Sequence, residues 1–166
     1  MTLLARDVMQ RNIGIIDAGS SLTELERAFE EAGVGGFPVV DGGRVVGVVS
    51  RTDVIRRLGG KAGAEPRLST FYADLSSFEV EHVSEGFAEA ATRGGQAADE
   101  LRVSDLMTAS AITVAPDASI DDVARALVEH KIHRVLVTED RTLVGVVSSL
   151  DLARLIAEEK FGPVAS

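Results

Sequence analysis

Apolar and polar positions follow the same series of patterns twice along the chain. In each half, a stretch with apolar residues at helical spacing begins at a capping box, which predicts an amphipathic helix that packs one face on a core. The two capping boxes are Ser21-x-x-Glu24 and Ser119-x-x-Asp122. The apolar positions are Leu22, Leu25, Ala28, Phe29 and Ala32 in the first half, and Ile120, Val123, Ala126 and Leu127 in the second.

Two short β-runs follow each predicted helix. They cover residues 37–40 and 45–49 in the first half, and residues 134–137 and 143–147 in the second. The first turn, Asp41-Gly42-Gly43, contains residues that tolerate positive φ and so favours a hairpin, whereas residues 139–141 are less diagnostic. A further helix is expected from near Thr52 to Gly59-Gly60, and another from near Leu150 toward Lys160. An apolar pair precedes the first helix of each half, Ile15-Ile16 in the first and Ile112 with Val114 in the second, so each half has the predicted order β-α-β-β-α.

The two halves are copies of one another. A shift of 98 positions, which places Asp7 on Asp105, aligns them without a gap as far as Val54, and residues 46–50 match residues 144–148 best. We call residues 1–57 copy one, residues 58–101 the insert and residues 102–166 copy two. A unit of about 50 residues buries little surface by itself. We therefore expect an α/β fold, resembling an α+β sandwich, in which the two copies pack about a pseudo-twofold axis.

The insert is too long for an ordinary connection. It is acidic, and the spacing of residues 85–91 predicts a helical part. Two interpretations remain open, a functional docking segment and a solvated spacer.

Composition restricts the function classes. Of the 166 residues 45% are apolar and 26% charged, which is enough to bury a core and excludes general disorder. The net charge of -9 disfavours binding to nucleic acids or anionic membranes. The absence of Cys excludes thiol catalysis, thiolate zinc sites and disulfides. Because no apolar run approaches the ~18 residues needed to span a bilayer, and the N-terminus lacks a signal-peptide pattern, we expect a cytoplasmic protein.

Three short motifs carry a family resemblance. Residues 47–53 (Gly-Val-Val-Ser-Arg-Thr-Asp) and 145–151 (Gly-Val-Val-Ser-Ser-Leu-Asp) share the pattern Gly-apolar-apolar-Ser-x-x-Asp. Asp-x-Met opens each copy, and Phe-Pro-Val-Val-Asp precedes the first turn. Together these motifs resemble the cystathionine β-synthase (CBS) domain, and the chain resembles a stand-alone pair of such domains, called a Bateman module.

The resemblance implies a regulatory function. Pairs of this family often bind AMP, ADP, ATP or, in some members, S-adenosylmethionine or NAD in the clefts between their repeats. They commonly form homodimers and control an enzyme, channel or transporter. For this chain the resemblance implies an adenine nucleotide (AMP, ADP or ATP) as regulatory ligand, no obligatory cofactor, a homodimer and an unidentified protein effector.

Asp53 and Asp151 are the candidate ribose ligands. A carboxylate at a strand-to-helix junction can accept hydrogen bonds from both ribose hydroxyls. However, Ser50-x-x-Asp53 and Ser148-x-x-Asp151 are also capping boxes, so helix starts alone explain the same residues. The spacing does not separate these two interpretations.

The phosphate site is expected in copy two. The resemblance places phosphate-contacting basic residues at His133 and Arg134, with Ser148 beside them, although the pair is also a plausible polar strand entry. Copy one has Gly35 and Gly36 at the matching positions, and its Thr52 supplies a hydroxyl where copy two has Leu150. The two sites should therefore be unequal. Thr113 is the side-chain candidate for contacting adenine.

Catalysis and metal binding are not expected. His130-x-x-His133 lacks a nearby third ligand, and no nucleophile motif or phosphate loop is present. The main alternative to nucleotide binding is a ligand-free interaction module, in which the two copies and the acidic insert dock a partner protein.

Overall fold

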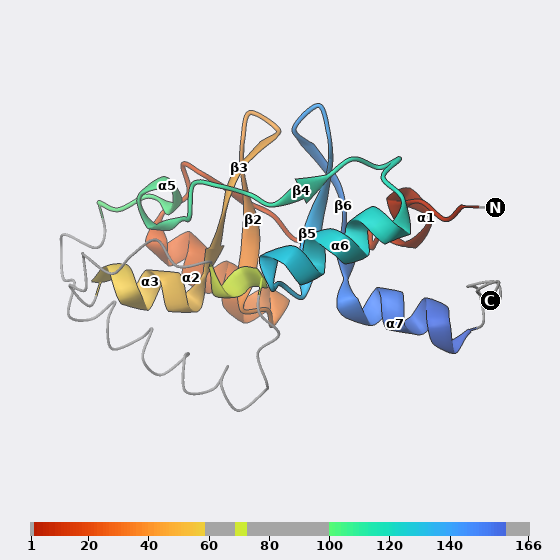
Figure 1. The fold of residues 1–166 in the computed structure, drawn as a ribbon. Helices are drawn as coiled ribbons and strands as arrows, with labels where there is room; N and C mark the ends of the chain where they lie inside the picture. Colours follow the sequence, from red (N-terminus) through yellow and green to blue (C-terminus); the bar gives the residue numbers. More distant parts are fainter. Residues whose placement is uncertain (1, 59–68, 73–99, 159–166) are drawn as a thin grey trace. The chain divides into compact units, whose positions relative to one another are not determined.

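The computed structural model describes residues 2–58, 69–72 and 100–158 (Figure 1). The chain divides into two compact units, Gly14–Ala111 and Met1–Ile13 together with Ile112–Ser166. We call them the copy-one unit and the copy-two unit, after the copy that supplies the sheet. Each unit contains the opening helix of the other copy. The copy-one unit contains α5 (Val103–Leu106), and the copy-two unit contains α1 (Ala5–Val8).

Both copies have the expected β-α-β-β-α order around a three-stranded mixed sheet. In each sheet the first strand runs parallel to the second, and the second and third form an antiparallel hairpin. Copy one forms β1 (Ile16–Asp17), α2 (Leu22–Ala32), β2 (Gly36–Asp41), β3 (Arg44–Ser50) and α3 (Arg51–Leu58). Copy two forms β4 (Thr113–Val114), α6 (Ile120–His130), β5 (Arg134–Glu139), β6 (Thr142–Ser148) and α7 (Ser149–Ala157). A 3-10 helix, η1 (Thr70–Tyr72), follows copy one. The predicted strands are confirmed, each lengthened at one or both ends.

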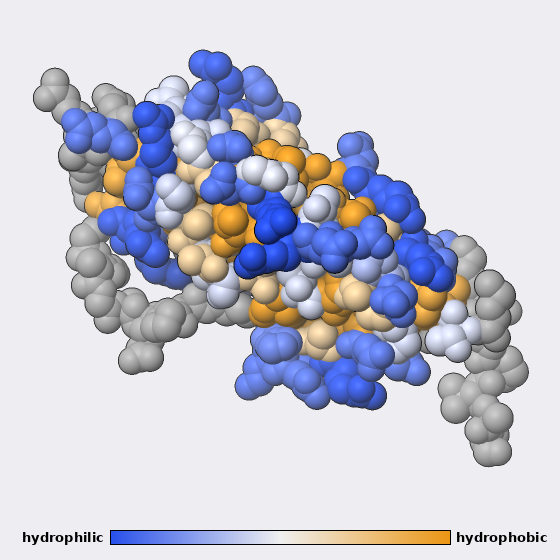
Figure 2. Space-filling view, turned by 90° about the horizontal axis from the view of Figure 1, so that it is seen from above, coloured by the Kyte–Doolittle hydropathy of each residue, from blue (hydrophilic) through white to orange (hydrophobic). Residues whose placement is uncertain are grey.

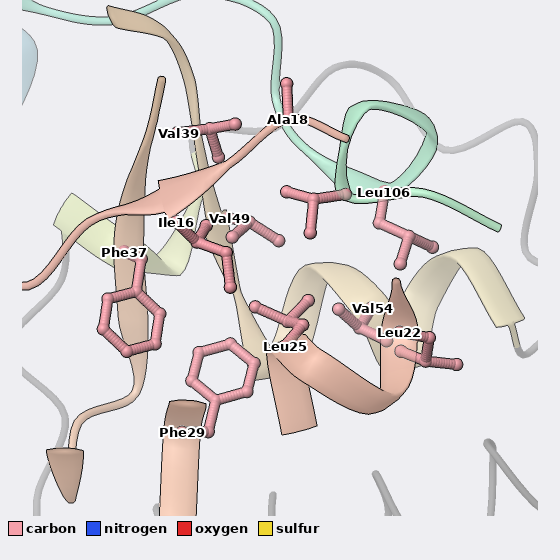
Figure 3. Close-up of a cluster of buried hydrophobic side chains, with 11 residues drawn as sticks. Ile16, Ala18, Leu22, Leu25, Phe29, Phe37, Val39, Val49, Val54 and Leu106 are labelled. Atoms are coloured by element: carbon pink, nitrogen blue, oxygen red, sulfur yellow. The ribbon is translucent and has the colours of Figure 1, made fainter. Parts of the chain in front are cut away.

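One face of the copy-one sheet forms the core shown in Figure 3. Ile16 pairs with Val39 and Phe37 pairs with Val49, so these four buried side chains lie on the same face. Phe29 of α2 stacks on Phe37, with 5.3 Å between the ring centroids. Burying an apolar side chain of this size contributes about 1.5–3 kcal/mol, which explains why the helical and strand periodicities predict the fold.

The capping box at the start of α2 is present in the structure. Ser21 Oγ accepts from the backbone N–H of Glu24, and the Glu24 carboxylate accepts from the backbone N–H of Ser21. These hydrogen bonds from Ser21, the backbone one first, lower the pKa of Glu24 below its ordinary value. The stabilisation from this carboxylate is therefore present at neutral pH and is lost as the pH falls through the lowered pKa.

Both hairpins use the same turn geometry although only one contains glycine. In copy one, Gly42 and Gly43 have φ values of 56° and 80°. In copy two, Asp140 and Arg141 have φ values of 50° and 68°. A two-residue turn with both residues at positive φ matches the twist of the strands that it joins. Arg141 thus adopts the positive φ that the two-residue turn requires, although arginine normally avoids it.

The Asp-x-Met motif of each copy caps a short helix and packs on the sheet of the other copy. Asp7 caps α1 by accepting from the backbone N–H of Leu4, at 2.9 Å. Two residues later Met9 packs against Gly145 of β6. In the copy-one unit, Asp105 caps α5 in the same way, and Met107 packs against Gly47 of β3. The glycine in each Gly-apolar-apolar-Ser motif therefore makes room for the methionine that opens the other copy.

Some expectations fall outside the described residues. These are the helix at residues 85–91, the Gly59-Gly60 stop and the extension toward Lys160. Within the described ranges, no helix has both the length and the apolar character needed to cross a membrane. Hydrophilic residues cover much of the surface seen in Figure 2, with apolar side chains exposed between them.

Candidate functional site

The copy-two sheet brings together most of the predicted ligand-binding residues. Arg134 at the start of β5 lies directly opposite Ser148 at the end of β6. Thr113 pairs with Leu136, which is two residues beyond Arg134 and so on the same face. This is the face opposite the buried residues Val135, Val137 and Val147. We call Thr113, His133, Arg134, Ser148 and Asp151 the copy-two polar group.

Asp151 is a capping residue in the structure. Its Oδ2 accepts from the backbone N–H of Ser148 at 2.8 Å and from the Ser148 hydroxyl at 2.7 Å. In return, Ser148 Oγ accepts from the backbone N–H of Asp151 at 3.2 Å. The capping interpretation of Ser148-x-x-Asp151 is thus confirmed, and it leaves Oδ1 outside the cap.

The side-chain amide of Gln10 is hydrogen-bonded to the second carboxylate oxygen of Asp151. Its Nε2 donates to Asp151 Oδ1 at 3.0 Å, and its backbone forms a two-way bridge with Val146 at 2.8 and 3.0 Å. Sequence patterns did not identify Gln10, because the matching position in copy two is Thr108 and nothing marks either residue. Only the fold brings Gln10, far away in sequence, to the start of α7.

His133 and Thr113 are positioned at the margin of the group. The His133 carbonyl accepts from the backbone N–H of Ser149 at 2.9 Å, which ties the entry of β5 to the start of α7. His133 and Thr113 are both exposed and Arg134 is partly buried, whereas Asp151 is buried. The copy-two polar group is thus accessible from solvent along part of its length.

The matching residues of copy one are arranged by the same register, with Ser50 and Asp53 buried. Gly36 lies opposite Ser50, as Arg134 lies opposite Ser148. Asp53 Oδ2 accepts from the backbone N–H of Ser50 at 3.0 Å, and Asp53 N–H donates to Ser50 Oγ at 3.1 Å. Ser50 is fully buried and Asp53 is 6% exposed. Thr52 is partly exposed in the first turn of α3.

Residues 69–72 of the insert cover Gly36, Ser50 and Asp53, which we call the copy-one position. Ser69 Oγ donates to Asp53 Oδ2, and Thr70 Oγ1 shares a hydrogen bond with Ser50 Oγ at 2.7 Å. Figure 1 draws η1 in yellow-green near the end of the β2–β3 hairpin that lies away from its turn, and η1 contacts both strands. The sequence contains no signal for this contact, because the insert has no matching segment in the other copy.

Arg51, the first residue of α3, packs against α2. Its guanidinium lies over the Phe29 ring, 5.0 Å from the centroid. Burial lowers the pKa of Arg51, and the negative charges of Glu30 and Glu26 oppose that shift. The Arg51 guanidinium is therefore partly buried against α2.

No group of three or more metal-ligating side chains forms among residues 2–58, 69–72 and 100–158. The site consists of hydroxyl, carboxylate and guanidinium groups, which suit the binding of a polar ligand.

Comparisons with known proteins identify the fold and the family. The CBS domain model matches residues 5–60 and 103–158, which together make up most of the chain. The uncharacterized protein MJ1426 of Methanocaldococcus jannaschii is 25% identical over 158 residues, covering 90% of this chain and 89% of that protein.

Two solved structures share the arrangement. CBSX2 in complex with AMP is 23% identical, with a TM-score of 0.63 over 95% of this chain and 98% of that one. The CBS domain pair of protein MJ0100 in complex with 5'-methylthioadenosine and S-adenosyl-L-methionine is 21% identical, with a TM-score of 0.60 over 96% of this chain and 99% of that one. The duplicated motifs, the two β-α-β-β-α repeats and the family match lead to one conclusion: this chain is a tandem pair of CBS domains and belongs to the CBS domain family.

Proposed function

We propose that this CBS pair is a regulatory module that binds an adenine nucleotide, AMP, ADP or ATP, at the copy-two polar group. The observation that carries the proposal is the position of Arg134 directly across from Ser148, with the Asp151 carboxylate bound to that serine. In this binding mode, Asp151 accepts hydrogen bonds from the ribose, Arg134 and His133 hold the phosphate together with Ser148, and Thr113 contacts adenine. Adenosine compounds bound in CBSX2 and MJ0100 support this ligand class.

Ribose binding and helix capping use different oxygens of Asp151. The cap uses Oδ2, whereas Oδ1 accepts from the Gln10 amide. An ionised carboxylate offers about four acceptor positions, so a ribose hydroxyl can join or replace Gln10 without breaking the cap. The structural role of Asp151 therefore does not exclude the ligand role.

Gln10 also provides a route by which the ligand changes the protein. Gln10 follows α1 and is bridged to Val146, so a ribose that replaces its amide acts directly on the N-terminal segment. A ligand shifts a conformational equilibrium only by its difference in affinity for the two states. We propose that the two states differ in whether Gln10 is bound to Asp151, and that an effector protein recognises the N-terminal segment.

The alternative is a ligand-free interaction module, and one observation favours it. Both aspartates already have partners within the chain, so capping explains their presence without a ligand. Thermal unfolding in the presence of AMP, ADP or ATP separates the two functions. A ligand that binds only the folded state stabilises it by about 2.7 kcal/mol at 100 times its Kd, which raises the melting temperature. An unchanged melting temperature with all three nucleotides at millimolar concentration would exclude the nucleotide proposal.

Replacing Arg134 tests the phosphate contact. Arg134→Ala is expected to weaken nucleotide binding by about 1.5–3 kcal/mol, or roughly 10- to 150-fold, because a hydrogen bond to a charged group is lost. Calorimetric titration with AMP and ATP measures the change. Arg125→Ala is the matched control, since it removes a cation from the exposed face of α6 and should leave the affinity unaltered. Equal affinities for Arg134→Ala and the unmodified protein would remove Arg134 from the site.

A further inference from the structure

The copy-one position is filled by the chain itself. The Asp53 carboxylate and the Ser50 hydroxyl, which match Asp151 and Ser148 of copy two, are bonded to Ser69 and Thr70 of the insert. Ser69 is 1% exposed. A ribose that approached this carboxylate would meet the Ser69 hydroxyl at Oδ2, which already provides the same kind of hydrogen bond, and Arg56, whose Nη1 lies 3.7 Å from Oδ1. The hydroxyl of Ser50 and the carboxylate of Asp53 are therefore already hydrogen-bonded within the chain.

An aromatic ring closes the part of the copy-one position that corresponds to the proposed phosphate contact of copy two. A Cβ atom at Gly36 would lie 3.0 Å from Phe71 Cδ2, 3.0 Å from the Val49 carbonyl oxygen and 3.4 Å from Phe71 Cβ. Gly36 matches Arg134, so in copy one the Phe71 ring takes the space into which the arginine side chain extends in copy two. Phe71 and Tyr72 are 5% and 1% exposed, which means that both aromatic side chains are anchored. An apolar ring thus replaces a cation at the place where a phosphate would need one.

We propose that residues 69–72 form a built-in plug that closes the copy-one position, so that each chain binds one nucleotide, at the copy-two polar group. This inference rests on the proposed function. The plug combines the two features that a nucleotide would need to replace, hydrogen bonds to Asp53 and Ser50 and apolar contact over Gly36. Opening it exposes two buried aromatic side chains, and burying such large side chains is among the strongest stabilising contributions in a protein. The asymmetry of the two copies is therefore a property of the insert as well as of the copies.

Equilibrium dialysis with radiolabelled AMP on the full chain counts the sites. The unmodified protein should bind one AMP per chain, Arg134→Gln should weaken that binding at least 10-fold, and Asp53→Asn should leave it unaltered. Two equivalent AMP per chain, or loss of the single site in Asp53→Asn but not in Arg134→Gln, would overturn the plug while the proposed function stands. Absence of AMP, ADP and ATP binding would overturn the proposed function itself.

Tyr72 reports on the plug directly. It is the only tyrosine in a chain without tryptophan, so the intrinsic fluorescence excited at the red edge of the tyrosine band comes from the plug alone. Acrylamide should quench this fluorescence weakly, both without AMP and at saturating AMP. Strong quenching that appears only with AMP would show that the nucleotide displaces the plug, and would overturn the inference.

Gly36→Arg should open the copy-one position. The new side chain needs the space of the Phe71 ring and also supplies the cation that copy two has at Arg134. We expect a second AMP site and a several-fold rise in the quenching of Tyr72. Val34→Arg, which adds the same charge at an exposed loop residue, should change neither. A folded Gly36→Arg protein with one AMP site and a protected Tyr72 would contradict the plug. If Gly36→Arg does not fold, the site count and the quenching of the unmodified protein decide the question.

Discussion

Deleting residues 1–11 is expected to destabilise the copy-two unit, although these residues belong to copy one in sequence. The backbone N–H of Ala5 donates to Ala118 at 2.8 Å, and that of Ile120 donates to Leu3 at 3.0 Å. The bridge between Gln10 and Val146 extends the sheet beyond β6. Met9 is buried against Gly145. Losing a buried methionine side chain costs about 2–5 kcal/mol, and the lost hydrogen bonds add about 1 kcal/mol each.

Hydrogen exchange resolved by peptide distinguishes the two units. The deletion should reduce protection in residues 134–148 and leave residues 36–50 protected. The single substitution Met9→Ala should act in the same direction with a smaller effect, whereas Met107→Ala, its match in the other unit, should reduce protection in residues 36–50. Loss of protection in residues 36–50 with residues 134–148 unchanged would contradict the exchange of opening helices seen in the structure.

Gly47→Ala is expected to cause a large loss of stability in the copy-one unit. A Cβ atom at this position would overlap the carbonyl oxygen of Thr108, which accepts from the backbone N–H of Val48 at 3.0 Å. The N–H of Thr108 donates back to Val48 at 2.8 Å. Because the obstacle is backbone and not the end of a flexible side chain, it can give way only if this two-way bridge breaks. We expect a destabilisation of about 2–4 kcal/mol, from overpacking and the lost hydrogen bonds.

Urea unfolding of Gly47→Ala and of a matched glycine variant measures this cost. In Gly19→Ala the added atom meets only the Asp17 carboxylate, at 3.1 Å, and this exposed side chain can move. Its stability should therefore stay within about 0.5 kcal/mol of the unmodified protein. Equal free energies of unfolding for the two variants would show that the β3 edge tolerates a side chain at Gly47.

Asp53 and Asp151 show how far the sequence defines a site. The Ser-x-x-Asp spacing predicted both a cap and a candidate ligand, and the structure contains the cap in both copies. Capping is a local interaction over three residues, so sequence spacing is sufficient to predict it. Whether either carboxylate is accessible depends on residues far away along the chain, Gln10 for Asp151 and Ser69 for Asp53. The spacing contains no information about these partners.

The sequence by itself determined the duplication, the order of elements in each copy and the faces that are buried. These follow from periodicity, because each helix and strand must turn its apolar positions toward a core. The tertiary structure alone decided which opening helix joins which sheet, and which copy keeps its polar group accessible. Those choices depend on backbone bridges such as that of Thr108 with Val48, and on the space above Gly36 that Phe71 fills. Backbone hydrogen bonds are available to every residue type, and an empty space is visible only once the chain around it has folded.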